Sequence, residues 1–137
     1  MPAVPVKEDL SRKTMGEDKV TVGVVGVGYL GKFHAEKYAV SAKARLVAVV
    51  DTDEVRAREV AQRYATEALT DYRSLFGRVQ CVSVAVPTQL HHRVARDFID
   101  AGIDVLVEKP MAVDLVQGRD LVETAQAKGL ILQVGHL

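Results

Sequence analysis

Apolar residues along this chain fall into short continuous runs separated by polar segments. Continuous apolar runs are typical of strands that are buried on both faces of a parallel sheet. Such runs lie at Val20–Val25, Leu46–Val50, Val79–Val86, Val105–Val107 and Leu130–Val134, with a weaker candidate at Ala68–Thr70. We therefore predict about six strands.

Between these runs, apolar residues recur at helical spacing, with capping residues at the ends. One helix has Ala57, Val60, Ala61 and Tyr64 on its apolar face and Asp53 as N-cap. A second has Val94, Ala95, Phe98 and Ile99 and ends near Gly102. A third has Leu115, Val122 and Ala125, with Asp114 and Gln117 capping its start and Gly129 closing its end. Strands that alternate with helices predict an α/β fold, a doubly wound parallel sheet with helices on both faces.

Composition and charge narrow the class of protein. The chain has 137 residues, 48% of them hydrophobic, and its 18 basic residues balance 18 acidic ones. We therefore expect a soluble, cytoplasmic protein with no nucleic-acid or membrane partner. Its single cysteine, Cys81, lies in an apolar run, where we expect a buried core residue, and no metal site is predicted. Residues 1–19 are charge-rich without apolar period and are expected to form a flexible tail before the domain at 20–137.

A glycine-rich turn, Gly26-Val27-Gly28-Tyr29-Leu30-Gly31, follows the first predicted strand and enters a helix. In the Rossmann fold, Gly26 would permit the tight turn, Gly28 would let the backbone approach a pyrophosphate, and Gly31 would allow close helix packing. The free N–H groups at the start of the helix would bind the phosphates. A strand–turn–helix packing motif without ligand is the alternative interpretation.

Asp51 ends the second predicted strand, where a carboxylate accepts hydrogen bonds from the adenosine ribose. Because a carboxylate repels a 2′-phosphate, the residue favours NAD over NADP as cofactor, although the nearby Arg56 leaves NADP open. Asp51 could instead be a capping or solvated turn residue. A methyltransferase, which also has a glycine-rich turn and an acid after its second strand, is a further alternative.

Two more segments lie at the carboxyl ends of predicted strands, where open α/β sheets bind ligands. They are Pro87-Thr88-Gln89-Leu90-His91 and Glu108-Lys109-Pro110. With the glycine turn, His34, Asp51 and the closing Val134-Gly135-His136, they make the chain from Val20 to Leu137 resemble the N-terminal domain of the Gfo/Idh/MocA oxidoreductase family. The family usually has Asn where this chain has Thr88, a departure in that segment.

The resemblance implies a role for each matching residue. Lys109 is expected to be catalytic, contacting the reacting hydroxyl and assisting proton transfer, and Glu108 is expected near the nicotinamide ribose. The bond before Pro110 is often cis in the family, and His91 would line the pocket near the nicotinamide. The expected cofactor-binding residues are Gly26, Gly28, Tyr29, Leu30, Gly31, Asp51, Pro87, Thr88, His91, Glu108 and Lys109. His34 and His92 are interpreted as a packing residue and a helix-start residue.

The resemblance also implies a function that this chain performs only in part. Family members transfer a hydride between NAD(P) and a hydroxyl of a sugar, sugar nucleotide or cyclitol. A second domain, which we expect to be missing here, supplies most substrate contacts, the partner acid or base and the oligomer interface. We therefore expect an NAD-binding domain that is inactive alone. A nucleotide-binding or regulatory module without catalysis is the alternative.

Overall fold

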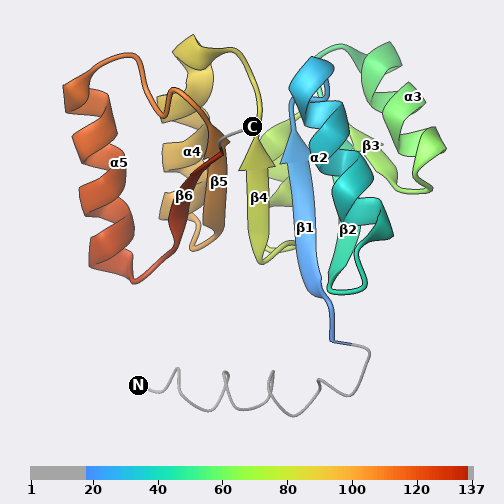
Figure 1. Cartoon of the computed structure of the whole chain (residues 1–137), viewed down its shortest axis with the longest axis horizontal. Coiled ribbons are helices and arrows are strands. Elements are labelled where there is room, and N and C mark those ends of the chain that lie inside the picture. The colour runs from blue at the N-terminus through green and yellow to red at the C-terminus, as the bar shows by residue number, and fades with distance from the viewer. Residues whose placement is uncertain (1–17, 136–137) are drawn as a thin grey trace.

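The computed structural model describes residues 18–135, and its strands form a single six-stranded sheet (Figure 1). The strands are β1 (Val20–Val25), β2 (Ala44–Val50), β3 (Glu67–Leu69), β4 (Cys81–Val84), β5 (Asp104–Glu108) and β6 (Leu132–Gly135). Every neighbouring pair is parallel and the order is β3-β2-β1-β4-β5-β6. This order is that of the Rossmann fold, so the predicted fold class is confirmed.

Helices cover the sheet in two groups, as the doubly wound prediction requires. The helices are α2 (Tyr29–Val40), α3 (Glu54–Arg63), α4 (His91–Asp100) and α5 (Leu115–Lys128), with short 3-10 turns η1 (Tyr72–Leu75) and η2 (Thr88–Leu90). Helix α2 packs on β1 and β2, and α3 packs on β2 and β3. Helix α4 packs on β4 and β5, and α5 contacts α4 and β6. In Figure 1, α2 lies in front of the sheet and α4 lies behind it.

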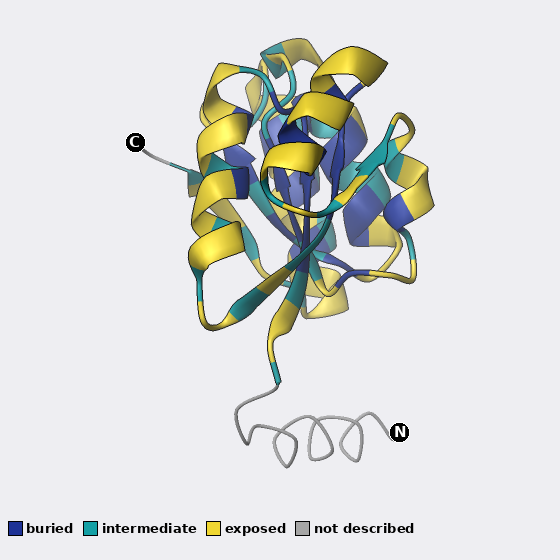
Figure 2. Ribbon diagram, turned by 90° about the vertical axis from the view of Figure 1, so that its right-hand side faces the viewer, coloured by how far each residue is buried: buried dark blue, intermediate teal, exposed yellow. Residues whose placement is uncertain are grey.

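Adjacent residues of the central strands point into two separate cores, one on each face of the sheet. Val24 and Val49 belong to the core beneath α2 and α3, whereas Val25 and Val50 belong to the core beneath α4 and α5. Figure 2 shows the buried strands enclosed between helices whose outer faces are exposed. Burial on both faces explains why the strands are continuous apolar runs in the sequence.

The structure corrects the predicted apolar face of α5. Leu115 is 82% exposed and Val122 is 37% exposed, whereas the buried residues of this helix are Gly118, Leu121 and Ala125. Gly118 has no side chain for a hydrophobicity pattern to detect, and it sits at the centre of the packed face. The caps at Asp114 and Gly129 are confirmed, because Asp114 accepts a hydrogen bond from the Gln117 N–H at 2.9 Å and Gly129 is left-handed at φ 68°. The side chain of Gln117 accepts instead from the Val113 N–H, at 3.4 Å.

Two further expectations need correction. The third long run, predicted as Val79–Val86, forms a strand only over Cys81–Val84, because the chain leaves the sheet beyond Ala85 towards the cleft described below. Cys81 is half-buried rather than fully buried, at the first position of β4, and burial raises the pKa of its thiol.

The expected tail lies outside the described residues except for positions 18 and 19. No described helix is long and apolar enough to cross a membrane.

Candidate functional site

A cleft of about 470 Å³ lies at the carboxyl ends of β1, β2 and β4. The chain leaves β1 into α2 on one face of the sheet and leaves β4 into α4 on the other, so the cleft lies where the winding reverses. Its lining comprises Val25, Gly26, Gly28, Leu30, Val50, Asp51, Thr52, Arg56, Thr70, Tyr72, Ala85, Val86, Pro87, Leu90 and Val94. Five predicted site residues are therefore brought together here: Gly26, Gly28, Leu30, Asp51 and Pro87.

The three glycines of the turn have different physical requirements. Gly26 has φ +91°, and a Cβ there would lie 2.8 Å from the backbone of Ala85. A Cβ on Gly31 would lie 1.6 Å from the carbonyl oxygen of Gly26. A Cβ on Gly28, in contrast, would meet nothing within 4 Å. The fold therefore requires glycine at positions 26 and 31, where a side chain would clash with the backbone. At position 28 a side chain would not clash with the protein but would project into the open space beside the cleft.

The N-terminus of α2 presents backbone N–H groups beside this open space. Gly28 is the N-cap, no side chain caps the helix, and its first turn has no acidic residue. The first helical hydrogen bond runs from the Lys32 N–H to the Gly28 carbonyl at 3.0 Å. The N–H groups of residues 29–31 therefore have no partner within the helix, and the positive end of the helix dipole lies with them. Tyr29 itself is exposed, outside the cleft lining.

Asp51 is a nearly buried carboxylate, 9% exposed, that organises the turns around it. Its Oδ2 accepts a hydrogen bond from the Val27 N–H at 3.0 Å, and its Oδ1 accepts one from the Asp53 N–H at 2.9 Å. The N-cap of α3 is Asp53, as predicted, so Asp51 is not the capping residue. Arg56 approaches Asp51 Oδ2 to 3.5 Å through Nη1. Because a carboxylate has about four acceptor positions, ribose hydroxyls can still donate to it.

The lining of the cleft also includes Tyr72, which sequence reasoning missed. Its hydroxyl donates to Oδ2 of Asp97 on α4 at 2.6 Å, and the Arg73 guanidinium lies 4.7 Å from the centre of its ring. Burial, and next the hydrogen bond to Asp97, raise the pKa of Tyr72. Thr70 and Tyr72 directly follow β3, so the rule that ligands bind at the carboxyl ends of strands was the signal that could have found them.

The Glu108-Lys109-Pro110 segment lies at the end of β5, outside the cleft lining. Lys109 is exposed, and the bond between Lys109 and Pro110 is cis, as the resemblance implied. Glu108 is 5% exposed, and its Oε2 contacts Nε2 of His34 on α2. His34, interpreted from sequence as a packing residue, is therefore a polar partner of Glu108.

The two histidines at the start of α4 differ in their surroundings. His91 is 2% exposed, with Nδ1 at 2.8 Å from the Pro110 carbonyl oxygen and Nε2 at 2.8 Å from that of Val86. Its ring therefore connects the chain beyond β4 to the chain beyond β5. The half-buried Thr88 opens the intervening turn η2. His92 pairs with Asp120 of α5 at 2.8 Å, which agrees with a structural role.

Comparison with known proteins places this geometry in a family. The family described as "Oxidoreductase family, NAD-binding Rossmann fold" (Gfo/Idh/MocA) matches residues 20–136. The UDP-N-acetylglucosamine 3-dehydrogenase of Acidithiobacillus ferrooxidans is 40% identical over 115 residues, which are 84% of this chain and 36% of that protein. The chain therefore spans about a third of the length of this curated relative.

Two solved structures share the fold and differ in cofactor. GenD2 from gentamicin A biosynthesis, in complex with NAD, has TM-score 0.83 and 34% identity over 85% of this chain and 34% of its own. The biliverdin reductase of Synechocystis, in complex with biliverdin and NADP+, has TM-score 0.81 and 28% identity over 85% of this chain and 38% of its own. Such relatives favour an oxidoreductase over the methyltransferase alternative. The chain belongs to the Gfo/Idh/MocA oxidoreductase family, with an NAD-binding Rossmann fold.

Proposed function

We propose that this chain is the cofactor-binding part of an enzyme that transfers a hydride between a nicotinamide dinucleotide and a substrate hydroxyl. The observation that carries the proposal is the open space at Gly28. The fold does not require glycine at this position, whereas a pyrophosphate passing over the backbone does. A packing motif without ligand would explain this glycine only as the N-cap of α2, a position that Ser, Thr, Asp or Asn fills at least as well.

The residues around the cleft fit a dinucleotide in chemistry as well as in shape. The unpartnered N–H groups at the start of α2 suit the two negative charges of a pyrophosphate. Asp51 suits the hydroxyls of the adenosine ribose, and the apolar side chains of Leu90 and Val94 suit the adenine face. The bound nicotinamide would supply the hydride chemistry, and the protein's task is to bind and orient.

Lys109 is the residue that we assign to the reacting hydroxyl. Lys109 is exposed and immediately follows Glu108, at the carboxyl end of β5. The glycine turn follows the carboxyl end of β1, so both segments lie on the same side of the sheet. The ammonium group of Lys109 can donate a hydrogen bond to a substrate oxygen and hold a proton there. The similarity to a UDP-N-acetylglucosamine 3-dehydrogenase supports a sugar nucleotide as substrate class, with sugars and cyclitols as the wider range.

We propose NAD as the preferred cofactor, because Asp51 would lie against a 2′-phosphate. Coulomb repulsion from this carboxylate disfavours NADPH, and Arg56, which is half exposed and pairs with Asp51 and Asp53, compensates only in part. Solved relatives are found with each cofactor, so the preference is a property to be measured on this chain.

Titration of the chain with NADH and NADPH tests both parts of the proposal. We expect NADH to bind more tightly than NADPH. Gly28→Ala should weaken NADH binding by about tenfold to a hundredfold, because a methyl group would displace the pyrophosphate from charge-assisted hydrogen bonds. Gly118→Ala is the matched control, since its Cβ would meet only Met111 Cε at 3.4 Å, away from the cleft. Unchanged NADH affinity in Gly28→Ala would overturn the placement of the pyrophosphate.

A further inference from the structure

Glu108 is a buried carboxylate enclosed by parts of the chain that are distant in sequence. It is the last residue of β5, and its Oε2 contacts Nε2 of His34, with side-chain exposures of 6% and 11%. On another side lies Gly135 of β6, where a Cβ would come within 3.1 Å of Oε2. A buried carboxyl group needs a hydrogen-bond partner beside it, and His34 provides one.

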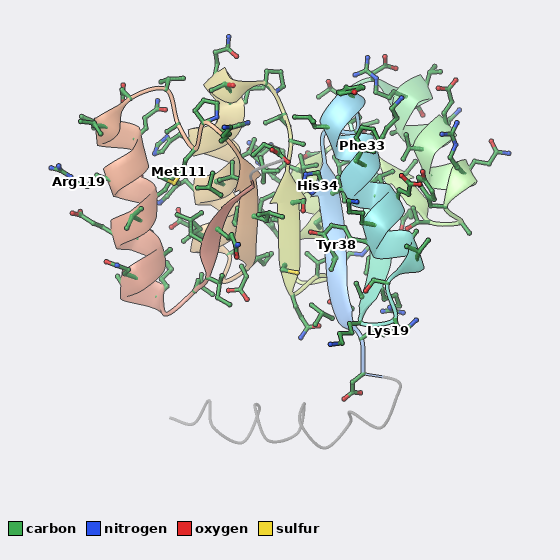
Figure 3. All side chains as sticks on the ribbon, in the orientation of Figure 1. Lys19, Phe33, His34, Tyr38, Met111 and Arg119 are labelled. Atoms are coloured by element: carbon green, nitrogen blue, oxygen red, sulfur yellow. The ribbon has the colours of Figure 1, made fainter. Side chains whose placement is uncertain are left out.

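The histidine that holds Glu108 belongs to the helix that begins at the cleft. Leu30, in the first turn of α2, lines the cleft, and His34 lies one turn further along the same helix. One more turn along, the Tyr38 hydroxyl is 2.6 Å from Ser83 Oγ of β4. His34 and Tyr38 are labelled in Figure 3 on successive turns of α2. The helix is therefore tied to β5 by one polar contact and to β4 by another.

We propose that His34 is a positioning residue that fixes the end of β5 relative to the phosphate-binding end of α2. By holding the carboxylate of Glu108, His34 sets where the backbone delivers Lys109. This inference rests on the proposed function, in which the N-terminus of α2 binds the pyrophosphate and Lys109, at the end of β5, meets the substrate hydroxyl, and on the expectation that Glu108 lies near the nicotinamide ribose. The contact between His34 and Glu108 then fixes the distance between the N-terminus of α2, which binds the pyrophosphate, and the end of β5, which lies beside the nicotinamide half of the same cofactor.

If His34 has this role, its substitution should change the affinity for NADH more than the affinity for ADP. NADH reaches both ends of the site, whereas ADP lacks the nicotinamide and its ribose and reaches only the adenosine and phosphate end. His34→Leu removes the partner of Glu108, so it should weaken NADH binding by about tenfold while ADP affinity stays nearly unchanged. His34→Gln should restore most of the NADH affinity, since the amide of Gln can also donate to a carboxylate.

The experiment compares the 137-residue chain with His34→Leu, His34→Gln and Tyr38→Phe, each titrated calorimetrically with NADH and with ADP. Tyr38→Phe is the matched control, because it removes the other buried polar contact of α2 and should change the two affinities by the same factor. Should His34→Leu fail to fold, His34→Ala provides the same comparison, because it also removes the partner of Glu108, and it should again weaken NADH selectively.

Three outcomes would overturn the inference. Equal weakening of NADH and ADP by His34→Leu would show that His34 only stabilises the fold. Unchanged affinity for both ligands would show that the contact between His34 and Glu108 does not position the end of β5 for cofactor binding. Binding of neither ligand to the unmodified chain would refute the proposed function itself, and the inference would fall with it. The first two results leave the proposed function intact, so the two failures are distinguishable.

Discussion

Asp51 illustrates how a single residue can serve the fold and the ligand together. Its two carboxylate oxygens accept hydrogen bonds from the backbone of Val27 and of Asp53, so the residue connects the glycine turn to the start of α3. From the sequence, Asp51 was predicted either to contact the ribose or to be a capping or solvated turn residue. The structure adds that the same carboxylate shapes the turn to which the cofactor would bind.

Asp51→Asn should therefore affect both stability and cofactor preference. The asparagine side chain has one acceptor oxygen, so one of the two backbone donors loses its partner, at a cost of about 1–3 kcal/mol in the free energy of unfolding. Removal of the negative charge should also bring the NADPH affinity closer to the NADH affinity. Urea unfolding followed by circular dichroism and titration with both cofactors measure the two effects.

Asp53→Asn is the control for this substitution. Asp53 is half exposed and caps α3, a position where Asn serves about as well as Asp. We expect little change in stability. If Asp51→Asn were as mild as Asp53→Asn in both measurements, the double role of Asp51 would be refuted.

At the scale of secondary-structure elements, the sequence predicted what local patterns can encode. The central strands β1 and β2 could be recognised as apolar runs because both faces of the sheet are buried at these strands. Of the packed face of α5, Ala125 was predicted, but Leu121 and Gly118 were not, and Gly118 carries no side chain to enter the pattern. The contact between His34 and Glu108 joins residues 74 positions apart, so no local pattern could show it. The glycine turn was predicted as a motif, but the distinct status of Gly28 needed coordinates.

The contact between α4 and α5 carries a pH-dependent contribution to stability. His92 Nε2 lies 2.8 Å from Asp120 Oδ2, and Arg96 Nη1 lies 2.7 Å from the same oxygen. The hydrogen bond from His92, and then that from Arg96, lower the pKa of Asp120 from its usual 3.8. Because the pKa is lower in the folded state, this stabilisation is present above pH 3.8 and is lost as the pH falls through the folded value.

Asp120→Asn should remove this contribution. The wild-type free energy of unfolding should decline as the pH is lowered below about 4, and the variant should decline less steeply. The effect should be modest and should shrink in high salt, because the Asp120 side chain is 36% exposed. Urea unfolding between about pH 3 and pH 7 measures it. Equal slopes in the wild type and in Asp120→Asn would contradict the prediction.

At the scale of the whole molecule, our proposal assigns to the described residues the cofactor end of a reaction. Lys109 is the one described side chain that we assign to the substrate hydroxyl. The UDP-N-acetylglucosamine 3-dehydrogenase relative is matched over only 36% of its length. Hydride transfer requires the reacting carbons to be held about 3–3.5 Å apart, and such positioning provides on the order of 7–11 kcal/mol. Most contacts that would position a sugar are therefore expected from sequence beyond the matched part.

We accordingly predict that the 137-residue chain binds NADH but does not turn over a sugar substrate. Incubation with NAD and UDP-N-acetylglucosamine, followed at the absorbance of NADH, should show no product above background. A chimera in which residues 20–135 replace the matching part of the Acidithiobacillus ferrooxidans enzyme should produce NADH, because the two chains are 40% identical over 115 residues and the rest of that enzyme would supply the substrate contacts.

Lys109→Ala in this chimera separates binding from chemistry. Loss of a group that assists proton transfer should lower the rate by about 10²–10⁴-fold. The Kd for NADH should stay nearly the same, because Lys109 is assigned to the substrate hydroxyl, whereas Glu108, which stays in place, is the residue expected near the nicotinamide ribose. Steady-state NADH production by the 137-residue chain alone would refute the prediction, since it would mean that the described residues position the substrate without further sequence. An active chimera that tolerates Lys109→Ala would instead refute the role assigned to this lysine, and the proton would then have to pass through another group.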